Sequence, residues 1–473
     1  MIVIPNLKLA PGADEAALKA LAAKALKIPV DDITGLRIRK KSLDARRKDD
    51  IHYVYTVGVT VRGDEQRLVR RCRSAAIAHE KAYPIPHVAP PETRPVIVGF
   101  GPAGMFAALL LARAGARPIV LERGPDARTR SAQIAAFRAG GAFDPECNVQ
   151  FGEGGAGTFS DGKLNTGTHD ARIGFVLAEF AAHGAPEHIT YDAKPHIGTD
   201  VLVEVVQSLR REVIARGGEV CFGHRMTGLS TQDGRITALT VHSPEGEYTL
   251  PAQQVILAIG HSARDTFEML HAQGVPMEPK PFSMGVRIEH RQSDINTAQY
   301  GAAAELLPAA DYSLSCHLPD GSSAYTFCMC PGGEVFAAAS EQGGVCTNGM
   351  SNSRRDGENA NAAVLVTLHP EDFPDKSTLG GMYWQRSIEQ RAYACGGGNY
   401  HAPAQRVGDF LAGRASTASG RVQPTYRPGV TWCDLHDVLP QRITATLAQA
   451  LPVFGQIGRR RVGKECRSRW SPY

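Results

Sequence analysis

Residues 94–124 read RPVIVGFGPAGMFAALLLARAGARPIVLERG. The apolar run Val96–Val98 suits a buried parallel strand. It is followed by a G-x-G-x-x-G spacing at Gly99, Gly101 and Gly104, and then by a helical pattern from residue 102 to about 114. A second apolar run at 118–121 ends at Glu122. The stretch therefore predicts a strand, a tight turn, a helix, a second strand and an acidic residue, in that order.

This order is typical of a dinucleotide site, because each part has a role in holding a pyrophosphate. Gly99 allows the tight turn, Gly101 lets the pyrophosphate approach the backbone, and Gly104 lets the helix pack closely on the strand. The free N–H groups and positive dipole end of the helix face the anion. Glu122, 18 residues after Gly104, can accept hydrogen bonds from a ribose diol, which favours FAD or NAD over NADP. A purely structural glycine turn is the alternative.

Composition limits the remaining possibilities. With 473 residues the chain can form two or three domains. Its 43% hydrophobic and 21% charged residues are ordinary for a soluble globular protein. No apolar run reaches the ~18 residues of a membrane span, and the first residues lack the pattern of a signal peptide. A net charge of +4 over this length gives no support to nucleic-acid binding.

The chain has ten cysteines, but no two of them form a C-x-x-C pair. Neither a zinc ribbon nor a thioredoxin-type motif is therefore predicted, and no metal site is expected. Without an export signal, the thiols are expected to be reduced. We therefore expect a cytoplasmic protein.

Residues 1–75 predict a separate small domain. Strand patterns at 2–9, 33–42 and 51–61 and a helix pattern at 14–26 give a ferredoxin-like β-α-β-β order. The turn between the last two strands includes the basic run RKKSLDARRK at 39–48. This run fits a solvated hairpin, or alternatively a docking surface for an acidic partner or a phosphate. The Pro-rich residues 76–92 predict a linker.

A second glycine-rich stretch, FGEGGAGTFSDGKLNTGT at 151–168, offers N–H groups and hydroxyls to an anion or a flavin edge. A flexible surface loop is the alternative. Further on, a helix pattern at 198–217 precedes a strand, a hairpin turn at Asp233-Gly234 and a strand at 255–260 that ends in glycine. This layout favours a large FAD-binding fold over a domain that binds only NAD.

Several motifs resemble the uncharacterised FAD-dependent dehydrogenases of the glutathione-reductase-like superfamily. They are GEGGAGTFSDGK at 152–163, KPHIGTD at 194–200, KPFSMGVRIEH at 280–290, FCMCPGG at 327–333 and NGMS at 348–351. The basic motif near the N-terminus is similar to the extra domain of that family, and the resemblance covers residues 1–455. It implies two-electron redox chemistry on FAD and names no substrate.

The same resemblance implies that relatives continue past a helix like 438–454 into another strand, a glycine-rich loop and a last helix that return to the flavin. Here residues 456–473 are instead a basic tail without apolar periodicity. We therefore expect weak FAD binding or low stability, with a functional basic tail as the alternative.

Together these observations predict an α/β fold. A Rossmann-like FAD-binding domain is expected at 93–261, a mainly β substrate insert at 262–429 and a return helix of the FAD domain at 430–455. Catalytic side chains would lie between the FAD domain and the insert, because a hydride donor must approach the flavin closely.

The residues expected to bind the cofactor come from the two glycine stretches and from the strand ends nearby. They are Gly99, Gly101, Pro102, Ala103, Gly104, Glu122, Arg123, Gly154, Gly155, Thr158, Ser160, Lys163, Met226 and Gly260.

The candidates for catalysis are Lys163, His261, Cys328 and Cys330. Lys163 could neutralise a reduced flavin or a substrate carboxylate, or could simply contact a phosphate or solvent. His261 could donate a proton, or be structural. The two cysteines would face the same side of a strand, either as a redox pair or as packing residues, and same-face neighbours are poorly placed for a disulfide.

The leading hypothesis for function is an FAD-dependent oxidoreductase that acts on a small metabolite by flavin hydride transfer. One alternative is a non-catalytic remnant that keeps the fold. Another is a flavoprotein that acts on or docks a nucleic acid through the basic N-terminal domain. No second G-x-G-x-x-G unit follows a strand, so direct use of NAD(P)H has no support. The substrate, the electron acceptor and the oligomeric state stay open.

Overall fold

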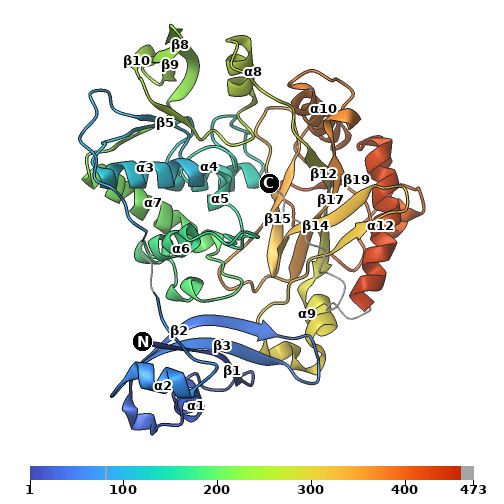
Figure 1. The fold of residues 1–473 in the computed structure, drawn as a ribbon. Helices are drawn as coiled ribbons and strands as arrows, with labels where there is room; N and C mark the ends of the chain where they lie inside the picture. The colour runs from blue at the N-terminus through green and yellow to red at the C-terminus, as the bar shows by residue number, and fades with distance from the viewer. Residues whose placement is uncertain (80–82, 460–473) are drawn as a thin grey trace.

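The computed structural model describes residues 1–79 and 83–459. It is a mixed α/β fold with several sheets. Figure 1 shows a small N-terminal sheet below a parallel sheet with its helices, and beside the latter a large antiparallel sheet with α12 along its outer face. No helix among the described residues is long and apolar enough to cross a membrane.

The N-terminal part forms one antiparallel four-stranded sheet in the order β2-β3-β1-β4. Its elements are β1 (Ile2–Leu9), α1 (Ala17–Leu26), β2 (Ile33–Asp44), β3 (His52–Val61), α2 (Glu65–Arg71) and β4 (Ala76–Ile77). The last two were not expected, and β4 lies within the predicted linker. It joins the sheet because Ile77 pairs with Ile2 at the edge of β1, beside a buried apolar cluster.

The 94–124 stretch forms the centre of a parallel sheet in the order β11-β5-β6-β7. The strands are β5 (Val96–Val98), β6 (Ile119–Glu122), β7 (Glu219–Phe222) and β11 (Val255–Leu257). The expected helices appear as α3 (Pro102–Ala114) and α7 (Thr199–Ala215), which pack against each other and against the sheet. Because the chain leaves β5 for β6 on one side and β11 lies on the other, the carboxyl end of β5 is a topological switch point.

A three-stranded meander covers the other face of the parallel sheet. It consists of β8 (Arg225–Gln232), β9 (Arg235–Ser243) and β10 (Gly246–Pro251). The hairpin turn expected at Asp233-Gly234 is present, with both residues at positive φ. Met226, predicted to bind the cofactor, is 3% exposed in the apolar cluster between this meander and the sheet, and its contact with the cofactor stays a prediction.

The second large sheet has the order β12-β17-β14-β13 and is antiparallel. Its strands are β12 (Phe282–Arg291), β13 (Ser315–His317), β14 (Ser323–Cys330) and β17 (Asn359–Leu368). The helix expected to return to the FAD domain is α12 (Gln441–Arg459), and it packs on this sheet instead. Ile443, Leu447 and Phe454 lie on its buried face against Val364 and Val366. This packing places α12 with the second sheet, whereas the sequence analysis assigned 430–455 to the FAD domain.

The remaining elements connect these layers. They are α4 (Ala127–Arg138), α5 (Gly155–Thr158), α6 (Arg172–Ala182), α8 (Arg264–Ala272), α9 (Gln292–Tyr300), β15 (Gly333–Ala337), β16 (Thr347–Ser351), α10 (Gly380–Cys395), β18 (Ala402–Ala404), α11 (Val407–Leu411) and β19 (Val430–Trp432). β15 pairs with β16. It does not pair with β14, although β15 directly follows β14 in the chain. Of the predicted basic tail, residues 460–473 lie outside the described residues.

Candidate functional site

The turn between β5 and α3 has room only for glycine at two positions. Gly99 has a φ of +98°, and a Cβ there would lie 2.4 Å from the carbonyl oxygen of Ala258. A Cβ on Gly104 would lie 1.9 Å from the carbonyl oxygen of Gly99. Both neighbours are backbone atoms, so a side chain could be admitted only by moving the turn itself. These glycines therefore shape the turn as the sequence predicted.

The first turn of α3 is free to bind an anion. Gly101 is its N-cap, no side chain caps the helix, and Pro102 stands at the first helical positions. Pro102 and Ala103 are both exposed. An exposed helix N-terminus without a capping side chain presents N–H groups and a positive dipole end. This geometry fits the pyrophosphate of a dinucleotide.

The second glycine stretch lies directly against this helix end. A Cβ on Gly155 would stand 3.0 Å from the Cα of Gly101. The fully buried Arg130 holds the stretch by donating hydrogen bonds to the carbonyl oxygens of Val149, Glu153 and Gly155, at 2.7 to 2.9 Å. Multiple charge-assisted bonds of this kind fix a backbone. The stretch is thus an ordered wall beside the helix end.

The hydroxyls of this stretch are used inside it. Thr158 is 1% exposed and donates to the carbonyl oxygen of Glu153 at 3.1 Å. Ser160 donates to the carbonyl oxygen of Gly157 at 2.7 Å. Gly154 takes a φ of +81° at the start of the short helix α5. These residues shape the wall, and their contact with a cofactor stays a prediction.

Glu122 stands at the carboxyl end of β6 and is 4% exposed. Its carboxylate accepts hydrogen bonds from the backbone N–H groups of Phe100 (2.7 Å), Gly124 (2.9 Å) and Gly152 (2.9 Å). A carboxylate has about four acceptor sites, which leaves one for a ribose hydroxyl. Glu122 therefore ties both glycine stretches together, and its contact with a ribose stays a prediction.

Three other predicted residues lie around the rim of this region. Arg123 forms ion pairs with Glu146 (2.7 Å) and Asp265 (2.8 Å). Gly260, just after β11, has a φ of +68°, and nothing lies within 4 Å of the position of a Cβ there. His261 is exposed, with the hydroxyl of Ser262 at 3.4 Å from its Nε2. The paired charges fix the position of Arg123, and the roles of Arg123, Gly260 and His261 at the cofactor stay predictions.

Lys163, Cys328 and Cys330 come together at one place. The Nζ atom of Lys163 lies 4.0 Å from the Sγ of Cys328 and 3.6 Å from the Sγ of Cys330. Lys163 lies within the same glycine stretch that packs against α3, so this cluster and the helix end are joined by one loop. The sequence predicted each of the three residues but not their contact.

The strand geometry at the thiols is irregular. The register of β14 against β17 shifts between Phe327 and Cys330, and Cys328 has a φ of +43°. A non-glycine residue in this region is uncommon and costs about 1–3 kcal/mol when strained. The bulge re-aims the side chains, so the simple alternation assumed from the sequence does not describe this end of β14.

Charged and amide groups that the sequence analysis did not assign surround the cluster. Asp161 is 1% exposed and pairs with Lys163 at 2.8 Å. It also pairs with Arg355, whose Nε lies 3.1 Å from the Oδ1 of Asp161. Arg287 donates to the carbonyl oxygen of Cys328 at 3.3 Å and also to Asn361. Asn361 is fully buried, and its Nδ2 has no hydrogen-bond partner. Asp161 lies within the GEGGAGTFSDGK motif, and this motif could have indicated Asp161 as a site residue.

These groups perturb the ionisation of the thiols and of the lysine. A hydrogen bond with Cys330 and the charges of Lys163 and Arg287 outweigh burial and lower the pKa of the Cys328 thiol. The hydrogen bond with Cys328 and burial raise the pKa of Cys330. Burial lowers the pKa of Lys163, but Cys330 and Asp161 outweigh it and the net shift is upward. Cys328 is thus the thiol that ionises first.

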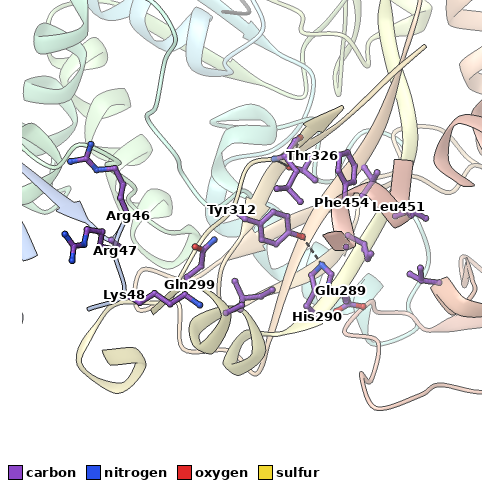
Figure 2. Close-up of a pocket in the computed structure, with 18 of the residues that line it drawn as sticks. Arg46, Arg47, Lys48, Glu289, His290, Gln299, Tyr312, Thr326, Leu451 and Phe454 are labelled. Atoms are coloured by element: carbon purple, nitrogen blue, oxygen red, sulfur yellow. Dashed lines mark hydrogen bonds between the residues drawn. The ribbon is translucent and has the colours of Figure 1, made fainter. Parts of the chain in front are cut away.

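A separate cavity of about 940 Å³ lies between the N-terminal hairpin, α9, α12 and the second sheet. Figure 2 shows Arg46, Arg47 and Lys48 on its hairpin side, and on the sheet side the hydrogen bond between His290 and Tyr312. None of the predicted cofactor or catalytic residues is among its lining residues. The cavity is of small-molecule size, but it is not the predicted site.

The basic hairpin carries less free charge than its sequence indicates. Arg46 pairs with Asp44 through its Nε at 2.8 Å, Arg47 with Asp49 at 2.7 Å, and Lys41 with Glu15 at 2.7 Å. Neutralised pairs attract a polyanion less than the same number of unpaired cations. This pairing agrees with the solvated-hairpin interpretation.

Among the described residues, one group has the spacing of a metal site, and it comprises Glu179, His183 and Glu212. Arg113 already lies between its carboxylates, at 2.6 Å from Glu179 and 2.8 Å from Glu212. A guanidinium in this position supplies the positive charge that a cation would bring. The group is an ion-pair network that joins α3, α6 and α7.

Comparison with known proteins now adds to this geometry. Residues 281–465 match a family described as FAD-dependent protein, C-terminal domain-like, and residues 92–145 match an FAD binding domain. Residues 1–60 match a domain of unknown function. An uncharacterised protein of Clostridium beijerinckii is 44% identical over 460 residues, which are 96% of this chain and 85% of that protein. The chain belongs to this family of FAD-dependent proteins. It is a flavoprotein of the oxidoreductase class, and FAD is its cofactor.

Solved flavoenzyme structures resemble the chain only distantly. Glycerol-3-phosphate dehydrogenase from Bacillus halodurans, complexed with FAD, is 12% identical with a TM-score of 0.31, covering 65% of this chain and 53% of that chain. Anhydrotetracycline hydroxylase from Streptomyces rimosus is 19% identical with a TM-score of 0.25, covering 58% and 44%. The chain thus spans about half the length of these two proteins. Similarity at this level does not indicate a substrate.

Proposed function

We propose that this FAD-dependent protein is an oxidoreductase that acts on a small molecule by hydride transfer. The observation that carries the proposal is the exposed, uncapped N-terminus of α3 at the switch point of the parallel sheet, with Gly101 against Gly155. The first turn of α3 would hold the pyrophosphate, and the last acceptor site of Glu122 would take a ribose hydroxyl. FAD, when bound, supplies two-electron chemistry.

The domain organisation is part of the same proposal. We infer that the parallel sheet with its meander is a Rossmann-like FAD-binding domain, and that β1 to β4 form a ferredoxin-like domain. The strand orders β11-β5-β6-β7 and β2-β3-β1-β4 support both assignments. The second sheet with α12 would be the substrate part. A location in the cytoplasm stays a prediction.

The residues of the chain set the electrostatics of this site. Lys163 carries a positive charge at the end of the glycine stretch, and Asp161 and Arg355 fix its position. A cation at this place can hold an anionic group of a substrate or the negative charge of a reduced cofactor. The site therefore suits an anionic or electron-rich small molecule.

The first test is the flavin content of the purified full chain. We expect denaturation to release FAD in a near-stoichiometric amount, and anaerobic reduction assays to bleach its visible absorption with a suitable donor. A protein that stays colourless after addition of FAD would contradict the proposal. It would favour the alternative of a related fold that binds flavin weakly or not at all.

A further inference from the structure

Two thiols at the end of β14 lie beside one lysine of the second glycine stretch. We propose that Cys328 and Cys330 form a reversible dithiol–disulfide pair that exchanges with disulfide substrates, with Cys328 as the attacking thiolate and Cys330 as the resolving thiol. This inference goes beyond the proposed function. It concerns protein sulfurs alone, so it can hold or fail whether or not the chain carries FAD.

The two thiols differ in exposure in the way such a pair requires. Cys328 is half-buried, and its neighbour Phe327 is 60% exposed at the same edge. Cys330 is fully buried. An attacking thiol must meet its substrate from solvent, whereas a resolving thiol needs only to reach its partner.

The charges around Cys328 favour its thiolate. Lys163 at 4.0 Å and Arg287, which donates to the carbonyl oxygen of Cys328, both carry positive charge. Asp161 opposes them, but it is itself paired with Lys163 and Arg355. Neighbouring cations are the usual means by which proteins activate a cysteine. The balance therefore stabilises negative charge on the Cys328 sulfur.

The backbone at the two cysteines departs from regular strand geometry. In a regular strand, residues two apart point the same way and are poorly placed for a disulfide. Here the bulge and the positive φ of Cys328 break that geometry, and the Cys330 thiol lies 3.3 Å from the carbonyl oxygen of Cys328. The pair therefore does not have the regular-strand geometry on which the objection from the sequence rests.

Two other cysteines, the buried Cys147 and the partly buried Cys346, behave as packing residues and provide a contrast. Burial raises the pKa of Cys147 to about 11 and that of Cys346 to about 12. A buried thiol of this kind acts as a small apolar side chain. Cys328 has a neighbouring lysine and an exposed edge, and packing explains neither.

The chemistry balances without any further reactant. The Cys328 thiolate attacks one sulfur of a substrate disulfide, forms a mixed disulfide and releases one substrate thiolate. The Cys330 thiol loses its proton to solvent and attacks the Cys328 sulfur, which forms the Cys328–Cys330 disulfide and releases the second thiolate. Two protein thiols are oxidised and one substrate disulfide is reduced, with two electrons transferred.

The first experiment measures the alkylation rate of each cysteine in the full chain at neutral pH, by mass spectrometry after iodoacetamide. We expect Cys328 to react at least about tenfold faster than Cys316, a partly exposed thiol on the adjacent strand β13. Lys163→Met should remove most of this difference, whereas Cys316→Ser should leave the rate of Cys328 unchanged. Equal rates at Cys328 and Cys316 would overturn the proposal.

The second experiment uses glutathione disulfide as the probe, with and without added FAD. We expect the peptide that contains both cysteines to lose two hydrogens, as an internal disulfide requires. Cys330→Ser should instead trap glutathione on Cys328, and Cys328→Ser should trap none at Cys330. If both thiols of the unmodified chain stay free under conditions that oxidise a reference dithiol, the pair is not redox-active and the proposal fails, whatever the flavin content.

Discussion

At the scale of single residues, Gly104 tests the cofactor cradle. A Cβ at this position would lie 1.9 Å from the carbonyl oxygen of Gly99 and 3.0 Å from its carbonyl carbon. Gly104→Ala must therefore displace the turn, and we expect a loss of about 1–3 kcal/mol in the free energy of unfolding together with most of the bound FAD. The measurements are released flavin per chain and urea unfolding.

Gly174 is the matched control for this change. It lies in α6, and nothing stands within 4 Å of the position of a Cβ. Gly174→Ala should keep the flavin content and stabilise the helix by up to about 1 kcal/mol. If both alanine variants kept the same amount of FAD, the α3 turn would not be the binding site.

At the scale of elements, the ion-pair network around Arg113 predicts a dependence of stability on pH. Hydrogen bonds from Arg113, on α3, lower the pKa of Glu212, on α7, from 4.5 to about 2. Because the folded pKa lies below the unfolded one, the stabilisation is present above about pH 4.5 and is lost as the pH falls toward about 2. Urea unfolding at a series of pH values should show this loss, and Arg113→Met should reduce it.

The exposed pair of Arg128 and Glu204 is the comparison for this prediction. Their side chains are 70% and 59% exposed, so solvent screens the pair. Arg128→Met should change the free energy of unfolding by less than about 0.5 kcal/mol and leave the acid dependence intact. An Arg113→Met variant with the acid profile of the original chain would show that the helix network is not the source.

At the scale of the whole molecule, Arg264 links the part around the parallel sheet to the part around the second sheet. It lies on α8, is 4% exposed, and pairs with Glu341 at 2.6 Å and with Glu389 of α10 at 2.7 Å. Arg264→Met would leave two partly buried carboxylates without this partner, of which Glu341 keeps Arg386. We expect a loss of about 1–3 kcal/mol. Urea unfolding followed by two probes, one in each part, should also become less cooperative.

The ion pair of Lys194 with Asp311 also joins distant segments, and it provides the control for this change. Its lysine is 66% exposed, so Lys194→Ala should cost less than about 1 kcal/mol. If Arg264→Met unfolded at the same urea concentration as Lys194→Ala, the ion pairs of Arg264 would contribute little to holding the two parts together.

The sequence predicted well whatever depends on neighbouring residues. The positions of Gly99, Gly101 and Gly104 define a local turn, and the turn at Asp233-Gly234 needs only its own two positive φ angles. The family resemblance implied a helix at 438–454, but it could not show which sheet the apolar face of α12 would cover. An apolar face on a helix indicates that this face is buried, but it does not indicate which element covers it.

By itself, then, the sequence determined the strand–turn–helix that we propose binds the dinucleotide, the FAD-dependent class and its cofactor, and the residue types available for chemistry. Only the tertiary structure decided that Lys163 meets two thiols 165 and 167 residues further on, that Asp161 pairs with Arg355, and that Met226 lies in the core. The reason is physical: hydrogen bonds within a turn are fixed by local backbone angles, whereas these contacts form only when separate sheets pack. A bulge in β14 then redirected Cys328, which no strand periodicity could have shown.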